Sequence, residues 1–356
     1  MKQKRLEILD FYRFVAILIV MFFHYFSRWT TPFNQYNLYP YENKYDYFLW
    51  GRLGVHFFFI ISGFVISMTL EKSINALDFT KKRILRLWPS MVLVSSITFM
   101  VMYLFDTKNI FPASKEWPNL LYSWTFLGKN LINNGLSYLD GSYWSLWVEV
   151  QFYFFAAVLY FFLRSVKVQH YLLYVLFAVS LIVAFSLPWM GEFNKMFNLF
   201  LYLHLFAMGV IYKELFSKDN PFGMKYWHYH AMIFILLLLG LKFYSDDMIT
   251  RLVYILVVAL FYAFIYFGSK QIMPKGYWWT WGVYLGEASY MSYLIHQNIG
   301  VVIINKIGYH GTFDFLVPLI VIVLMFGIGA LLFQYFEKPL MIYAKSKWFK
   351  KPAVSQ

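Results

Sequence analysis

The chain carries ten long apolar segments, and these restrict it to one class of fold. As a helix, about 20 consecutive apolar residues cross the hydrocarbon core of a bilayer. A backbone in lipid can form only helices or a closed barrel, and these segments are too long and too uniformly apolar for barrel strands. We therefore predict an all-α, polytopic membrane protein, a bundle of about ten transmembrane helices. The segments are residues 8–27, 53–70, 89–105, 144–163, 171–187, 198–216, 230–244, 251–268, 284–303 and 314–336.

The composition agrees with this prediction and removes several classes of function. Charged residues make up 14% of the 356 residues, whereas a soluble domain carries about 25%. The chain has no cysteine, which excludes disulfides, cysteine-bound metals and a cysteine acyl-enzyme. A net charge of +13 would suggest a nucleic-acid partner in a soluble protein. In a membrane protein, basic cytoplasmic loops explain that charge, so we expect no nucleic acid.

The distribution of Lys and Arg predicts the orientation. With the N-terminus in the cytoplasm, the inner loops and tails hold 20 of these residues and the outer loops hold nine. Positive charge accumulates on the cytoplasmic side, so we expect both termini there. The basic N-terminus has no small-residue cleavage site, which is typical of an uncleaved signal-anchor. We expect one membrane domain over residues 1–345, followed by a short basic cytoplasmic tail over 346–356.

The first span, Ile8 to Phe26, carries Arg13 near one end and His24 towards the other. A charge at membrane depth costs roughly 2.5–3.5 kcal/mol on insertion scales, so it calls for a functional reason. The eleven-residue step turns a helix through about 1100°, which places both side chains on one face, roughly 16 Å apart. Imidazole is the usual general base near neutral pH. A histidine that is simply hydrogen-bonded within the bundle is the alternative.

Polar residues recur in the second span and in the inner loop after it. The second span begins GRLGVHFFFIISGFVIS at residue 51, with Arg52 at its outer mouth and Ser62 midway, and its glycines permit close helix approach. The inner loop reads FTKKRILRLWP over residues 79–89. We expect it to be a short basic helix that ends where Pro89 starts the third span. Its cations suit either anionic membrane lipid or a polyphosphate ligand.

The later spans carry further polar positions. Glu149 lies in the fourth span, which begins GSYWSLWVEVQFYFF at residue 141, and Trp144 indicates the membrane interface there. A buried carboxylate needs a partner, and His24 and Arg52 are the candidates. A bond to His24 would fix the histidine tautomer, whereas a Glu–Arg pair would be structural.

In the ninth span, Ser289, Tyr293 and His296 share one helix face, which predicts a cavity lining. Near the end, FEKPL at 336–340 predicts a Glu337–Lys338 pair before a proline stop. Residues 119–128, within the long outer loop 106–143, are apolar enough to dip into the membrane. The eight histidines are scattered without an HExxH pattern, so no metal site is expected.

Taken in order, these pieces resemble the acyltransferase-3 family of membrane acyltransferases over nearly the whole chain. The likeness is carried by Arg13 with His24, then GRLGVHFFFIISGF, RILRLWP, YWSLWVEVQFYF, SYMSYLIH and FEKP. The family commonly has an acidic residue where this chain has His56. The resemblance implies a multi-pass protein of the bacterial inner membrane. It also implies transfer of an acyl group, often acetyl from cytoplasmic acetyl-CoA, to a hydroxyl of O-antigen, capsule or exopolysaccharide.

The resemblance and the polar positions together predict a reaction path. Acetyl-CoA is expected as the donor substrate, with no permanently bound cofactor, and its phosphates would meet Arg13, Lys82, Arg83 and Arg86. His24, oriented by Glu149, would act as general base or carry the acetyl group as an acyl-imidazole. A transporter or flippase of a sugar or anionic substrate is the alternative function, and the oligomeric state is left open. The residues expected to contact the acceptor are Arg52, Ser62, Trp144, Tyr293 and His296.

Overall fold

The structure, a computed structural model, describes residues 6–28, 46–127, 135–165, 171–186, 198–243, 248–270, 274–308 and 315–348. Within these ranges the chain is helical and contains no strand, as the apolar segments predicted. The first helices are α1 (Glu7–Phe26), α2 (Leu53–Glu71), α3 (Ala76–Phe105), α4 (Trp117–Trp124), α5 (Trp144–Ser165) and α6 (Leu172–Ser186). The later ones are α8 (Leu199–Phe216), α9 (Trp227–Phe243), α10 (Met248–Ser269), α11 (Tyr277–Glu287), α12 (Ser289–Ile307), α13 (Leu316–Leu332) and α14 (Lys338–Trp348).

Eight helical segments in the described ranges are long and apolar enough to cross a membrane, which makes this a multi-pass membrane protein. Two of the predicted spans differ from the helices in the structure. The sixth helix, α6, has only 15 residues, and the predicted span 284–303 is divided between α11 and α12 at Ala288. Every residue of α12 from Ser289 to Val302 is buried. A polar helix in such a position faces protein rather than lipid.

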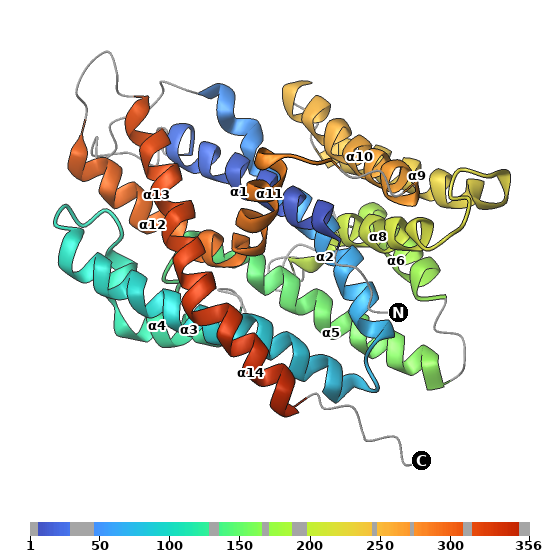
Figure 1. The fold of residues 1–356 in the computed structure, drawn as a ribbon, viewed down its shortest axis with the longest axis horizontal. Helices are drawn as coiled ribbons and strands as arrows, with labels where there is room; N and C mark the ends of the chain where they lie inside the picture. Colours follow the sequence, from blue (N-terminus) through green and yellow to red (C-terminus); the bar gives the residue numbers. More distant parts are fainter. Residues whose placement is uncertain are drawn as a thin grey trace.

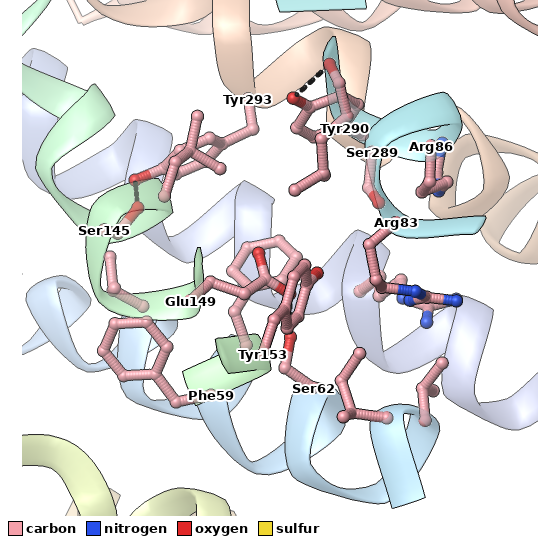
Figure 2. A pocket seen from close by; sticks show the side chains of 17 residues that line it. Phe59, Ser62, Arg83, Arg86, Ser145, Glu149, Tyr153, Ser289, Tyr290 and Tyr293 are labelled. Carbon is pink, nitrogen blue, oxygen red and sulfur yellow. Dashed lines mark hydrogen bonds between the residues drawn. The ribbon is translucent and has the colours of Figure 1, made fainter. Parts of the chain in front are cut away.

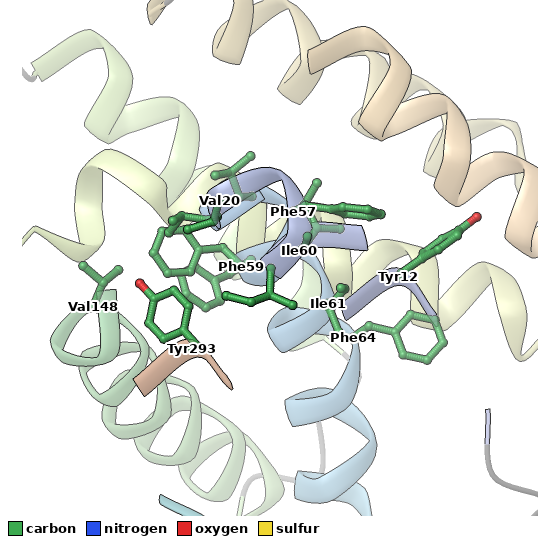
Figure 3. Close-up of a cluster of buried hydrophobic side chains, with 14 of the residues drawn as sticks. Tyr12, Val20, Phe57, Phe59, Ile60, Ile61, Phe64, Val148 and Tyr293 are labelled. Atoms are coloured by element: carbon green, nitrogen blue, oxygen red, sulfur yellow. The ribbon is translucent and has the colours of Figure 1, made fainter. Parts of the chain in front are cut away.

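The centre of the molecule is built from α1, α2 and α12, with α12 packed against α1, α3 and α13 (Figure 1). On the other side, α2 crosses α8, and α8 contacts α6, α9 and α10. Aromatic side chains of α1 and α2 fill the core between these groups, among them Tyr12, Phe57 and Phe64 (Figure 3). The central helices therefore carry their polar side chains into the interior of the bundle, away from lipid.

Glycine makes the closest helix crossings possible, as the sequence predicted. A Cβ atom at Gly63 would clash with the backbone carbonyl of Phe206 on α8, and one at Gly209 would clash with that of Ile60 on α2. The α2–α8 crossing is thus a backbone-to-backbone contact in which neither helix has room for a side chain. Gly54 meets α1 in the same way, at the carbonyl of Ala16.

Two proline boundaries predicted from the sequence are wrong. The basic segment 79–89 is no separate helix, because α3 begins at Ala76 and continues through Pro89. The Asn75 side chain accepts the Asp78 amide hydrogen at 2.9 Å and starts this helix early. At the other end, a π-turn over Phe333–Glu337 leads directly into α14. Pro339 follows this π-turn as the second residue of α14, and the helix continues through it.

The short helix α4 packs along α3. Trp124 donates its indole hydrogen to Ser95 Oγ at 2.9 Å, and Ser95 is a fully buried residue near the middle of α3. The segment after Phe105 therefore returns along α3 as far as its midpoint. This is the geometry expected of a segment that dips into the membrane.

Candidate active site

The histidine of the first predicted span, His24, and that of the ninth predicted span, His296, are in direct contact. His24 Nδ1 on α1 lies 2.7 Å from His296 Nε2 on α12, and both side chains are buried. The other ring nitrogen of His296, Nδ1, lies 2.6 Å from the carbonyl oxygen of Tyr293, one turn earlier. The Tyr25 hydroxyl donates to the His296 carbonyl at 2.6 Å and ties α1 to α12 at this point.

This chain of contacts fixes the tautomers of the neutral pair. A carbonyl oxygen only accepts, so His296 Nδ1 must carry a hydrogen and donate it to Tyr293. Nε2 of a neutral His296 then has only its lone pair, and His24 Nδ1 must donate to it. His24 Nε2 is left unprotonated, which is the state of a general base or a nucleophile.

His24 lines a cavity of about 440 Å³, which we call the histidine cavity. It lies between the C-terminal end of α1, the N-terminal end of α2, the start of α5 and α8. The Arg52 and Trp144 positions predicted to meet the acceptor line it, as does Tyr293. Its lining comprises Val20, Phe23, His24, Arg28, Arg52, Val55, His56, Trp144, Leu201, Tyr202, His204 and Tyr293.

A second cavity of about 180 Å³ holds three arginines, and we call it the arginine cavity. Arg13 comes from the N-terminal part of α1, and Arg83 and Arg86 come from the first turns of α3. Glu149 and Ser62 line the opposite wall, where the Ser62 hydroxyl donates to a Glu149 carboxylate oxygen at 2.5 Å (Figure 2). Three cations with hydroxyl groups beside them form a site suited to an anionic ligand.

One wall separates the two cavities. Val55 and Tyr293 line both of them. The Tyr293 hydroxyl lies 2.7 Å from Ser145 Oγ and donates to the Ser142 carbonyl at 2.9 Å, which holds the ring in place. A group that passes between Arg13 and His24 must therefore cross this Val55–Tyr293 wall.

The predicted partners of Glu149 are not the ones found. Glu149 bonds to Ser62 in the arginine cavity, whereas His24 and Arg52 line the histidine cavity. Glu149 lies more than one turn further along α5 than Trp144. This position places it on the arginine-cavity side of the Val55–Tyr293 wall. The orienting partner of His24 is His296, and the prediction that Glu149 orients His24 is replaced by this contact.

The four predicted donor-binding cations do not form one group. Lys82 lies outside the arginine cavity and bonds to Asp78 at 2.7 Å. Arg13 pairs with Asp10 at 2.5 Å, and Arg86 forms an ion pair with Glu337. Glu337 therefore reaches across to α3 and does not form the predicted pair with Lys338.

Arg28 is a site residue that the sequence analysis missed. It was counted only among the outer-loop charges, yet it lines the histidine cavity one helical turn beyond His24. The four-residue spacing from His24 was the available signal. Burial lowers the pKa of the Arg28 guanidinium from its usual value, and the neighbouring carboxylate of Asp140 opposes that shift.

Asp140, just before α5, is fully buried and holds this region together. It accepts hydrogen bonds from the Ser142 amide at 2.8 Å and from the Asn298 amide of α12 at 3.0 Å. Burial raises the pKa of the Asp140 carboxyl, while these bonds and the charge of Arg28 act in the opposite direction. The network fixes the start of α5 against α12 beside the histidine pair.

Residues 6–334 match the family model described as an acyltransferase domain. The chain belongs to the acyltransferase-3 family. The match covers both cavities and every predicted site residue.

Curated relatives of this acyltransferase-3 chain come from Staphylococcus aureus. It is 24% identical over 331 residues to the "Putative O-acetyltransferase" of strain COL, covering 83% of this chain and 50% of that protein. It is 26% identical over 186 residues to the O-acetyltransferase OatA of strain NCTC 8325, covering 49% of this chain and 28% of OatA. The chain thus spans half, or less, of the length of these relatives. No solved structure matches it significantly.

Proposed function

We propose that this protein is a membrane O-acetyltransferase that moves an acetyl group from cytoplasmic acetyl-CoA to a hydroxyl of a cell-surface or lipid-linked carbohydrate. The observation that carries the proposal is the pair of cavities on either side of the Val55–Tyr293 wall. One contains three arginines, and the other contains a histidine with an unprotonated Nε2. The Staphylococcus aureus relatives named O-acetyltransferases support the reaction class.

The donor would enter the arginine cavity. At about 180 Å³ this cavity holds only part of acetyl-CoA, so the phosphates would lie at its rim with Arg13, Arg83 and Arg86. The pantetheine arm would extend toward Tyr293 and would place the thioester at the Val55–Tyr293 wall. Arg83 is the strongest candidate for phosphate. Arg13 and Arg86 are already paired with Asp10 and Glu337, whereas the Arg83 Nε has no hydrogen-bond partner among the described residues.

The acceptor hydroxyl would enter the histidine cavity. His24 Nε2 removes the hydroxyl proton as the oxygen attacks the thioester carbonyl carbon, the carbon–sulfur bond breaks, and coenzyme A leaves as the thiolate. The charge on His24 is stabilised through its Nδ1–H bond to His296, and the proton then passes to the thiolate. Arg28 and Arg52 line the same cavity and would stabilise the oxyanion. A positioned base of this kind contributes about 10²–10⁴-fold.

The experiment uses purified protein in nanodiscs with labelled acetyl-CoA and a surface-glycan fraction. We expect release of coenzyme A thiol that depends on the acceptor, together with acetylated glycan detected by mass spectrometry. A transporter or flippase would leave the thioester intact, and that result would refute the proposal. Incubation without acceptor, followed by mass analysis of the His24 peptide, distinguishes an acyl-imidazole from direct transfer.

A further inference from the structure

A third cavity, of about 770 Å³, lies between α3, α5 and the end of α4. We call it the apolar groove. Phe79, Leu87, Trp124 and Ala157 form part of its lining, and Arg83 is the one charged residue among those that line it within the described ranges. The groove is more than four times the volume of the arginine cavity, and most of the side chains that line it are apolar or aromatic.

Arg83 lies in the wall between this groove and the arginine cavity, because it lines both together with Tyr153. Its guanidinium is 5.8 Å from the Phe79 ring centroid and 5.7 Å from that of Tyr153. These contacts hold the charge against two aromatic rings of the lining. Nη2 donates to Thr69 Oγ1 at 3.1 Å, while Nε is buried and has no acceptor in the described part of the chain. The wall of the groove therefore contains one cation, and one donor of its guanidinium has no partner in the described part of the chain.

The mouth of the groove opens between exposed apolar side chains of α3 and α5, so we expect it to face lipid. Ile84, Trp88, Phe154 and Val158 line it and are about half exposed or more, with Phe154 at 64%. Because α3 and α5 are both candidate membrane spans, a ligand enters from the bilayer rather than from water. On α3 the lining runs from Ala76 to Trp88 with Arg83 between them. The charge thus lies in the N-terminal half of α3, which we expect on the cytoplasmic side.

We propose that the apolar groove binds one chain of an anionic phospholipid from that leaflet, with the lipid phosphate at Arg83. An apolar groove with one guanidinium in its wall matches an amphiphile with one negative head group. Binding does not depend on acyl transfer. Lipid binding would, however, compete with the donor, because a lipid phosphate and an acetyl-CoA phosphate cannot both occupy Arg83.

Native mass spectrometry of the full chain, released from nanodiscs of phosphatidylglycerol or phosphatidylcholine, tests this proposal by counting retained lipids. We expect wild-type protein to retain phosphatidylglycerol at least tenfold better than phosphatidylcholine. Ala157→Trp fills the groove and should abolish retention, whereas Val323→Trp, on the 72% exposed position of α13, should retain lipid as the wild type does. Arg83→Gln should retain both lipids equally.

Two further measurements keep the result interpretable. If Ala157→Trp does not fold, Val158→Trp at the 51% exposed mouth replaces it. Inorganic phosphate alone should not displace phosphatidylglycerol, because the chain supplies much of the binding; displacement would show a free-phosphate site instead. Equal lipid retention by wild type and the groove-filling variant would overturn the proposal, and so would equal retention of the two lipids by the wild type.

Discussion

His24 and His296 share a hydrogen bond of 2.7 Å although 272 residues separate them in the chain. Within the described residues, the bonds of the pair engage both nitrogens of His296 and Nδ1 of His24, which leaves His24 Nε2 as the basic nitrogen. A carboxylate in the place of His296 would have fixed the same tautomer. An imidazole does so without adding a negative charge inside the bundle, which would carry a high desolvation cost.

His296 is therefore expected to act by positioning His24, and a glutamine should substitute for it. In His296→Gln the side-chain amide can donate to the Tyr293 carbonyl and its oxygen can accept from His24 Nδ1. We expect His296→Gln to keep most of the kcat. In His296→Leu we expect the kcat to fall about 10–100-fold, which is part of the 10²–10⁴-fold rate contribution of a positioned general base. KM for acetyl-CoA should be unchanged in both. Equal loss in both variants would indicate a purely structural histidine.

Arg28 should contribute to the reaction although it follows the span. Arg28→Gln removes a charge from the histidine cavity, and we expect kcat to fall about 10²–10³-fold, as for loss of an oxyanion donor. Lys108→Gln, an exposed change outside the cavities, is the control and should be neutral. Steady-state kinetics with acetyl-CoA would show whether kcat changes. An effect on the donor KM alone would place Arg28 elsewhere in the reaction.

Arg83 and Lys82 are adjacent, but their variants should differ. Arg83 lines the arginine cavity, and its Nε has no partner among the described residues, whereas Lys82 is bound to Asp78 outside that cavity. A hydrogen bond to a charged group contributes about 1.5–3 kcal/mol, so Arg83→Gln should raise the donor Kd at least tenfold. Lys82→Gln should change it less than twofold. Calorimetric titration with coenzyme A measures both, and the reverse order would exclude this donor site.

The α2–α8 crossing predicts a stability difference between two glycines. A methyl group at Gly63 would meet the backbone of Phe206, whereas a methyl group at Gly327 on α13 would have nothing within 4 Å. We expect Gly63→Ala to cost about 1–3 kcal/mol or more and to lower the Tm by roughly 3–10 °C. Gly327→Ala should leave the Tm unchanged or slightly higher. A thermal unfolding scan of the two variants gives the comparison.

The local sequence pattern was enough to predict the helical class, the close helix crossings at glycines and the shared helix face of Arg13 and His24 on α1. It did not predict which residues these two side chains contact. Whether Glu149 or His296 meets His24 depends on how α5 and α12 pack against α1, and no local pattern carries that information. Pro89 and Pro339 did not mark helix boundaries. The helix α3 begins at the Asn75 cap and continues through Pro89, and the π-turn over Phe333–Glu337 leads into α14 before Pro339. Arg28 was missed because its charge was counted with a loop.

The proposed mechanism depends above all on His24 performing the transfer chemistry, and a comparison of two histidine variants can decide this. Acceptor-dependent release of coenzyme A is measured for wild type, His24→Ala and His228→Ala, the last a histidine of α9 that lines neither cavity. We predict that His24→Ala lowers the rate at least 10²-fold with donor binding intact, while His228→Ala matches the wild type. A His24→Ala protein that transfers acetyl at the wild-type rate would show that another group performs the chemistry.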